Sequence, residues 1–228
     1  MSNLAAYSEI ISNRENMYLF LTNIYKTEVT DSFYNIIKNL DFSSEPQNEL
    51  SGGYERILGF CRTDWHDPVT DLAVDYARIF LGAGVVETAQ SAFPYESVYT
   101  SEKRLIMQEA RDEVLALYRK YGLGVSSKYN IPEDHLALEL EFMAHLCGLV
   151  RQSAENGDFK KTVSLLREQR EFIEKHLMRW VPAFCNDIGR IASTEFYRGA
   201  AELTVSFLNM DAEIVSDLLV NFQHEQEG

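Results

Sequence analysis

The chain has 228 residues, 46% of them hydrophobic and 25% charged, which is enough apolar sequence to bury a sizeable core and excludes an intrinsically disordered chain. It carries 21 Lys and Arg against 35 Asp and Glu, a formal net charge of −14. Because the basic residues are scattered among carboxylates, we expect no binding to nucleic acid or to anionic lipid surfaces, and we expect basic partners to be favoured.

Helical spacing of apolar residues begins near the N-terminus. Residues 4–26 carry apolar side chains close to every 3.6 positions, and a shorter helix is predicted from Asp31. Asp67 and Pro68 then form a strong helix-start signal, since a carboxylate can cap the free amides and proline suits the first helical position. The helix that they open is predicted to end at Gly82.

An irregular segment is predicted from about residue 82 to residue 101, where Pro94 disfavours helix. Its ~20 residues exceed an ordinary connection between helices, which indicates a functional loop or a hinge. Helices are predicted again over 102–121, from Pro132 (a central helix, apolar on almost all sides), over 158–180, from Pro182, over 195–208 and over 211–222. No long alternating strand pattern occurs, so we predict an all-α fold, a multi-helix bundle forming a single domain over residues 1–228.

Two short stretches concentrate binding-type side chains. PYESVY (94–99) places two tyrosines and a carboxylate on a loop between helices. PEDH (132–135) gathers acids and an imidazole at the start of the central helix, where Glu133 and Asp134 suit the helix dipole and Asp134 could cap. A charged His135 would not be favoured there, so the helix start explains the acids and leaves His135 to a binding role.

A metal-dependent enzyme is the main alternative. His66 and Asp67 are typical of an HD-type phosphohydrolase, which is also all-helical and would here use His66, Asp67, His135 and Asp187. Asp67, however, already has a capping role before Pro68.

Two further residue pairs could present metal ligands. His135 with Glu139, and Glu141 with His145, are four positions apart and could share a helix face, but no second helix supplies a matching set. No phosphate-binding glycine loop and no nucleophilic serine turn are present. We therefore expect no catalytic residue, no metal and no cofactor.

The cysteines and the N-terminal residues bear on the cellular compartment. Cys61, Cys147 and Cys185 lie far apart without metal-ligand spacing, which indicates a reducing compartment. The first residues, MSNLAAYSEIISNREN, lack the basic head and apolar run of a signal peptide, and no segment approaches the ~20 apolar residues of a membrane span. We expect a cytoplasmic protein with no stable membrane insertion.

Four blocks, in order, resemble the TorD/DmsD family of redox-enzyme maturation chaperones: YARIFLG (76–82), PYESVY (94–99), PEDHLALELEFMAHL (132–146) and WVPAFCNDIGRIASTEFYRGAAELTVSFL (180–208). The resemblance implies an all-helical cytoplasmic chaperone, not an enzyme. Such a chaperone binds the twin-arginine signal peptide and the apo form of a molybdopterin oxidoreductase of the dimethyl-sulfoxide or trimethylamine-oxide reductase class. It assists cofactor insertion and delays export. The resemblance also allows a monomer or a homodimer that exchanges helices about the 82–101 segment.

The resemblance also implies a peptide-binding region. Carboxylates suit the two guanidiniums of a twin-arginine leader, and aromatic walls suit the apolar stretch that follows them. Carried over by position, the region comprises Tyr76, Phe80, Pro94, Tyr95, Glu96, Ser97, Tyr99, Pro132, Glu133, Asp134 and His135.

One departure leaves the client of such a chaperone open. Some members of the family have Pro-Trp-Gly-Ser where this chain has Pro94, Tyr95, Glu96 and Ser97. Two other interpretations also stay open: the aromatic side chains of the loop fill the core beneath it, or the chain is a helical adaptor whose partner is not a leader peptide.

Overall fold

Helices make up nearly all of the regular structure in a computed structural model of the chain, which describes residues 4–40, 48–84, 91–124 and 131–227. The expected all-α class is confirmed, and within the described residues the strand-type pairing is limited to an isolated bridge between Tyr95 and His135. In chain order, the helices are α1 (Leu4–Lys26), α2 (Asp31–Lys38), α3 (Ser51–Arg62), α4 (Pro68–Leu81), α5 (Glu96–Thr100), α6 (Glu109–Lys120), α7 (Leu136–Glu155), α8 (Phe159–Phe172), the π-helical turn η2 (Ile173–Leu177), α9 (Met178–Ile191) and α10 (Glu195–Glu227).

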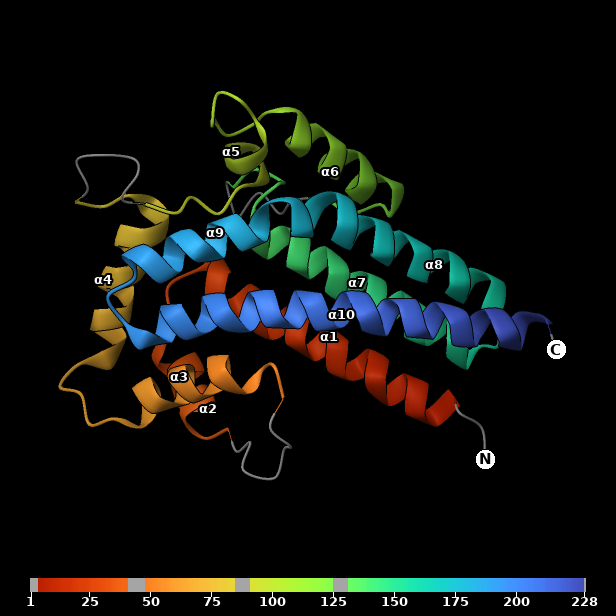
Figure 1. Ribbon diagram of the computed structural model, residues 1–228, viewed down its shortest axis with the longest axis horizontal. Coiled ribbons are helices and arrows are strands. Elements are labelled where there is room, and N and C mark those ends of the chain that lie inside the picture. Colours follow the sequence, from red (N-terminus) through yellow and green to blue (C-terminus); the bar gives the residue numbers. More distant parts are fainter. Residues whose placement is uncertain (1–3, 41–47, 85–90, 125–130, 228) are drawn as a thin grey trace.

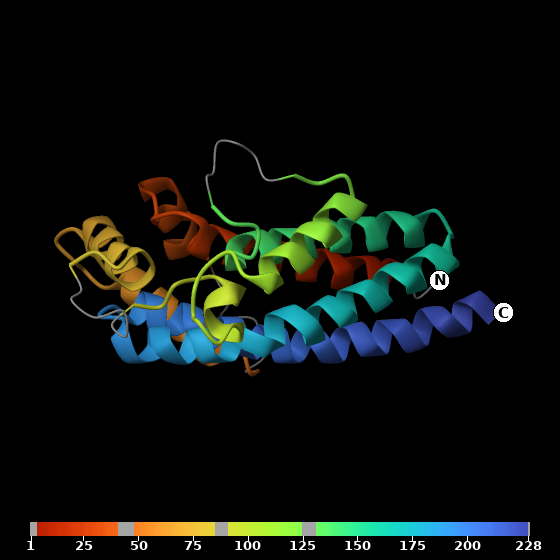
Figure 2. The ribbon, with the colours of Figure 1, turned by 90° about the horizontal axis from the view of Figure 1, so that it is seen from above.

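The long helices form the body of the molecule (Figures 1 and 2). α1 packs on α7, α7 on α8, and α8 on α10, while α9 returns along α10. The start of α1 and the end of α10 lie at the same end of this body (Figure 1). At the other end lie α2, α3 and α4, with α3 against α10, and α5 with α6 lies beside η2, α8 and α9.

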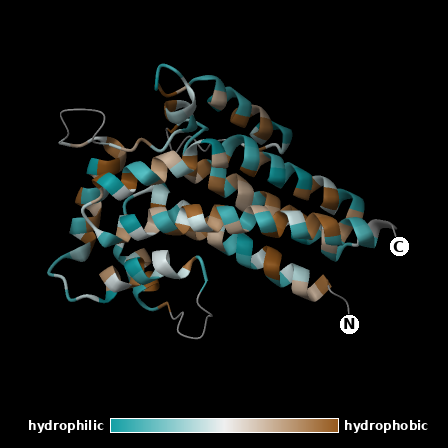
Figure 3. Ribbon diagram, viewed as in Figure 1, coloured by the Kyte–Doolittle hydropathy of each residue, from teal (hydrophilic) through white to brown (hydrophobic). Residues whose placement is uncertain are grey.

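Apolar faces of these helices build one continuous core. α7 contributes buried residues on nearly every side, as its apolar pattern predicted. Other helices alternate apolar and polar residues around their circumference (Figure 3) and bury one stripe each. In the described part of the chain, no helix combines the length and the apolarity that crossing a membrane requires.

A charged cluster ties α1, α8 and α10 together inside this core. Arg14 donates to both oxygens of Asp211, at 2.5 and 3.0 Å, and also to Gln169 Oε1 at 2.8 Å. The Tyr18 hydroxyl donates to Asp211 Oδ2 at 2.6 Å. All four side chains are buried, so opposite charges are paired and hydrogen-bonded within one cluster.

The cysteines belong to this core as free thiols. Burial raises the pKa of Cys61 and of Cys147 to about 12, so these thiols stay protonated near neutral pH. They act as small apolar residues.

The predicted boundaries of the first helices are confirmed. α1 spans residues 4–26 as expected, and Asp67 Oδ1 caps α4 by accepting from the Thr70 amide at 3.3 Å. Gly82 ends α4 with φ of 70°, in the left-handed region that glycine adopts without steric cost.

Several predicted boundaries after residue 82 were wrong. The segment 82–101 contains the short helix α5, although its residues 85–90 lie outside the described part. α6 begins at Glu109 instead of 102, and α7 begins at Leu136 instead of Pro132. Pro182 lies inside α9, and the two helices predicted over 195–222 are the single helix α10.

α3 and α10 cross with their backbones in contact. A Cβ atom on Gly53 would lie 2.7 Å from the Leu203 amide nitrogen, and one on Gly199 would lie 2.8 Å from the Gly53 carbonyl oxygen. Only glycine leaves room for this approach, so the crossing depends on a glycine from each helix.

Candidate functional site

The PYESVY loop and the PEDH turn are one structural unit, although 32 residues (100–131) separate them in the chain. The Glu96 amide donates to the Asp134 carbonyl, and the Leu136 amide donates to the Pro94 carbonyl, both at 2.9 Å. These bonds flank the bridge between Tyr95 and His135, whose rings meet edge to face at 5.0 Å between centroids. The structure therefore brings the two predicted segments together, and we call residues 94–100 with 132–136 the loop–turn unit.

Asp134 anchors the loop through its side chain. Its carboxylate is fully buried, and Oδ2 accepts from the Ser97 amide at 2.9 Å in the first turn of α5. The Ser97 hydroxyl in turn accepts from the Gln108 amide at 3.0 Å, which fixes the start of α6. Asp134 and Ser97 are thus positioning residues that a docked peptide cannot touch in this arrangement.

His135 has a structural explanation that the sequence interpretation missed. It is the N-cap of α7, and its Nδ1 accepts from the Ala137 amide at 3.1 Å. Burial lowers the pKa of His135 to about 3, with a further contribution from Lys26, so the imidazole is neutral and can accept. The residue expected to cap, Asp134, lies one position too early.

Glu96 is the centre of a buried acidic cluster. Its Oε2 lies 2.8 Å from His176 Nδ1, a hydrogen bond that joins α5 to the π-helical turn η2. Glu139 on α7 lies beside it, and Glu139 Oε2 accepts from the Trp180 indole at 3.1 Å. Burial raises the pKa of Glu139 well above its ordinary value, and the Glu96 charge raises it further, so a protonated Glu139 can donate to Glu96.

Neither His176 nor Glu139 was a predicted site residue. Glu139 was considered only as a metal ligand, and nothing in the amphipathic pattern of 158–180 distinguishes His176 from its neighbours. The π-helical turn changes the helical register at His176, and π-helical turns frequently mark functional sites.

The carboxylate of Glu133 is partly exposed and already engaged. Arg111 on α6 donates to both of its oxygens, from Nε at 2.5 Å and from Nη2 at 3.1 Å. The Tyr118 hydroxyl also donates to the Glu133 carbonyl at 3.2 Å. α6 is therefore fastened to the loop–turn unit by the same fork geometry that an incoming guanidinium would use.

The predicted aromatic residues divide into core and surface. Tyr76 and Phe80 are 5% and 2% exposed, and the Tyr76 hydroxyl donates to the Tyr25 carbonyl inside the bundle. Tyr99 packs on Trp180 and donates to Asp187 Oδ2 at 3.2 Å. Tyr76 and Phe80 therefore fill the core, whereas Tyr99 and Tyr95 are both half-buried.

Of the remaining predicted residues, Pro94 is buried under the loop and Pro132 is partly exposed at the turn. The accessible part of the predicted region therefore consists of Tyr95, Pro132 and Glu133, with part of Tyr99.

The residues of the metal-enzyme alternative do not assemble. His66 is exposed beside the α4 cap, His135 caps α7, and Asp187 pairs with Arg190 and Tyr99. Across the described ranges, no group of three His, Cys, Asp or Glu side chains is arranged to hold a metal ion.

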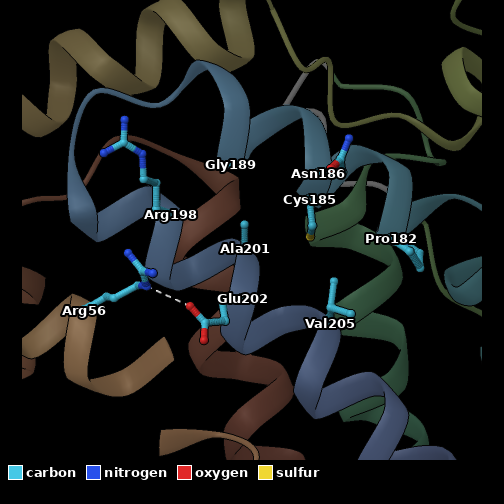
Figure 4. A pocket seen from close by; sticks show the side chains of 9 residues that line it. All are labelled: Arg56, Pro182, Cys185, Asn186, Gly189, Arg198, Ala201, Glu202 and Val205. Carbon is cyan, nitrogen blue, oxygen red and sulfur yellow. Dashed lines mark hydrogen bonds and ion pairs between the residues drawn. The ribbon is translucent and has the colours of Figure 1, made fainter. Parts of the chain in front are cut away.

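Hollows indent the described surface, and one of them adjoins the loop–turn unit. This α6–α8 groove, of about 690 Å³, runs between α6 on one side and α7, α8 and η2 on the other, and His176 lines it. A second hollow of about 390 Å³ lies between α3, α9 and α10, where Arg56 pairs with Glu202 (Figure 4). A third of about 510 Å³ lies beside Trp65. The second and third contain none of the predicted site residues.

Comparisons with known proteins agree with the four sequence blocks. Residues 45–186 match the family model described as nitrate reductase delta subunit. A chaperone protein TorD from Vibrio cholerae serotype O1 is 33% identical over 67% of this chain and 66% of its own length. Another from Photobacterium profundum is 25% identical over 93% of this chain and 97% of its own length, and one from Aliivibrio salmonicida is 28% identical over 86% and 80%.

Proposed function

Because this chain belongs to the nitrate reductase delta subunit family, of the TorD/DmsD type, we propose that it is the maturation chaperone of a molybdopterin oxidoreductase and binds the twin-arginine leader of that client. The relatives are named chaperones, and the chain is a chaperone of this family, not an enzyme. In the proposed role it works in the cytoplasm, holds the apo form of the catalytic subunit until the cofactor is inserted, and thereby delays export.

The observation that carries the leader-binding part is the loop–turn unit itself. A leader with two guanidiniums needs carboxylates and aromatic faces on one surface. The loop–turn unit presents the Tyr95 ring and the Glu133 carboxylate, which a leader guanidinium would take over from Arg111, and the formal net charge of −14 attracts a basic segment at long range.

The buried acids support this surface from inside. Glu96 and Asp134, expected as direct contacts, are both fully buried, so in the proposed site they position the loop while Tyr95 and Glu133 make contact. Alanine at either buried position would leave the loop–turn unit without an anchor. Such a variant therefore cannot separate a lost contact from a lost fold.

The test is titration of the full chain with a labelled twin-arginine peptide and with a twin-lysine copy. We expect saturable binding that weakens with salt, prefers arginine, and falls about 5- to 50-fold in Tyr95→Ala and Glu133→Gln, as for contact residues at an interface centre. Trp65→Ala, at an exposed aromatic residue beside the third hollow, is the control. Unchanged affinity in both loop–turn variants would refute this site, and absence of any binding to wild type would refute the leader-binding function.

A further inference from the structure

Glu133 carries the accessible carboxylate of the loop–turn unit, since Glu96 and Asp134 are fully buried. Its two oxygens both accept from Arg111 of α6, one from Nε at 2.5 Å and the other from Nη2 at 3.1 Å. A leader guanidinium that forms the same planar fork needs the same two oxygens. The leader and Arg111 therefore compete for one carboxylate.

The Arg111–Glu133 pair lies where water and a ligand can reach it. The two side chains are 25% and 15% exposed, so the pair can open without disturbing the core. Arg111 Nη1 also donates at 3.0 Å to Oδ1 of Asp112, a side chain that is 75% exposed. A displaced guanidinium thus keeps a second carboxylate beside it, which lowers the cost of leaving Glu133.

α6 has further attachments that do not involve the Arg111 guanidinium. One stripe of the helix is buried against the body of the protein: Ala110, Val114 and Tyr118. The Tyr118 hydroxyl donates to the Glu133 carbonyl at 3.2 Å, and the Gln108 amide donates to the Ser97 hydroxyl at 3.0 Å. Packing and these hydrogen bonds hold α6 in place when Arg111 leaves the Glu133 carboxylate.

We propose that Arg111 is a resident competitor of the leader: it occupies Glu133 in the free chain and lowers the affinity for every ligand that binds this carboxylate. This inference rests on the proposed function and deepens it by naming a residue that sets the affinity of the site. The apparent dissociation constant equals the intrinsic one divided by the fraction of molecules in which Glu133 is free. Removal of the competitor therefore tightens binding, whereas removal of a merely structural residue weakens binding or leaves it unchanged.

Such a competitor has a physical use in so acidic a chain. A net charge of −14 attracts any basic segment, whatever its sequence. The Arg111–Glu133 pair raises the dissociation constants of all these ligands by the same factor, because each of them has to open the same pair. A ligand arginine restores the fork and still gains from the exchange, whereas a ligand lysine replaces the fork by a point charge and gains little.

The test compares Arg111→Ala with Arg119→Ala. Arg119 is exposed on the same helix, so both variants remove one positive charge from α6. The probes are the labelled twin-arginine peptide and its twin-lysine copy. We expect Arg111→Ala to bind both peptides about 3- to 10-fold more tightly, and by equal factors, because the same pair no longer has to open. Arg119→Ala should stay within about 2-fold of wild type, since an exposed charge away from the site is screened.

A double-variant cycle separates competition from other effects of the substitution. In the Glu133→Gln background the carboxylate is gone, so Arg111→Ala should give no gain in affinity. Arg111→Lys keeps the charge without the fork and should give a smaller gain, about 2- to 5-fold. Circular dichroism and thermal unfolding of each variant establish that it is folded.

Two results overturn the competitor and leave the proposed function standing. One is that folded Arg111→Ala and Arg111→Lys bind the twin-arginine peptide no more tightly than wild type. The other is a gain that persists in the Glu133→Gln background. Absence of binding to both wild type and Arg111→Ala overturns the proposed function, and this inference with it.

Discussion

Two of the clusters of buried charged side chains in the described residues are built differently. Around Arg14 and Asp211, an acid meets a base, and tyrosine and glutamine add hydrogen bonds, although Arg14 Nη1 has no acceptor among the described residues. Around Glu96, Glu139 and Asp134, acids lie near acids: Glu139 and Glu96 can share a proton, and Asp134 Oδ1 has no donor among the described residues. The first cluster fastens three helices together, whereas the second depends on protons and on nearby cations. We therefore expect the loop–turn end to be more sensitive to pH and to charged partners than the Arg14–Asp211 cluster.

Breaking the balanced cluster should have the largest effect on stability. Asp211→Asn leaves the buried Arg14 guanidinium without its counter-charge, so we expect the free energy of unfolding to fall by about 3–5 kcal/mol. Urea unfolding at neutral pH measures it. Asp217→Asn, at an exposed position on the same helix, should change stability by less than about 0.5 kcal/mol. Equal effects at the two positions would contradict the role given to the balanced cluster.

Removing a donor from the acidic cluster should have the next largest effect. Trp180→Phe takes the indole N–H away from Glu139 Oε2 and leaves space in the core, so we expect a loss of about 2–3 kcal/mol. In the control, Trp65→Phe, the lost indole bond to the Phe60 carbonyl lies near the surface, and we expect less than about 1 kcal/mol. The difference between the two variants in chemical denaturation reports how much the acidic cluster relies on that donor.

The pH dependence of stability should separate the clusters further. Because the folded pKa of Glu139 is raised above its ordinary value of 4.5, the folded state holds this proton more tightly than the unfolded state. Below pH 4.5, Glu139 is protonated in both states and does not change the stability with pH. Above pH 4.5, the free energy of unfolding falls by up to about 1.4 kcal/mol per pH unit until the pH passes the folded-state pKa of Glu139.

Glu139→Gln should remove this fall of stability with pH, so its free energy of unfolding should exceed that of wild type most at the alkaline end of the range. Glu141→Gln, on the exposed face of the same helix, should leave the slope intact. Urea midpoints collected between pH 5 and pH 8 decide it. A slope that persists unchanged in Glu139→Gln would assign the pH response to other groups.

The smallest effect is expected at the edge of the acidic cluster. Arg179 is half-exposed and 4.0 Å from Glu96, so Arg179→Ala should change stability by no more than about 0.5 kcal/mol. Thermal unfolding at low and at high salt checks this. A loss above about 2 kcal/mol would mean that Arg179 balances the acids as Arg14 balances Asp211, and the contrast between the two clusters would fail.

Local signals predicted those parts of the fold that local chemistry controls. The Asp67–Pro68 start and the Gly82 stop were correct because capping and left-handed backbone geometry involve only neighbouring residues. The break predicted before Asp211 was wrong because its carboxylate binds Arg14, nearly 200 residues away in the chain. The helix start predicted at Pro182 was also wrong, since burial of Trp180 and Val181 keeps α9 continuous through the proline.

The candidate site shows the same division. The sequence identified the two segments that form the loop–turn unit, because unusual combinations of aromatic and acidic residues mark both. It could not reveal which side chains face inward. Glu96 and Asp134 are charged residues that an ordinary reading places at the surface, and their burial depends on the pairing of residues 94–96 with 134–136. It also gave no sign of His176, whose position depends on a π-helical turn.

The close crossing of α3 and α10 carries a consequence for how this chain can vary. Where helices meet through side chains, a change in one residue can be absorbed by repacking its neighbours. Neither Gly53 nor Gly199 has a side chain that could repack, so even a single added methyl group must push α3 away from α10. The position of α3 on α10 is thus fixed by direct backbone contact, and a glycine-to-alanine substitution at either residue is enough to disrupt this crossing.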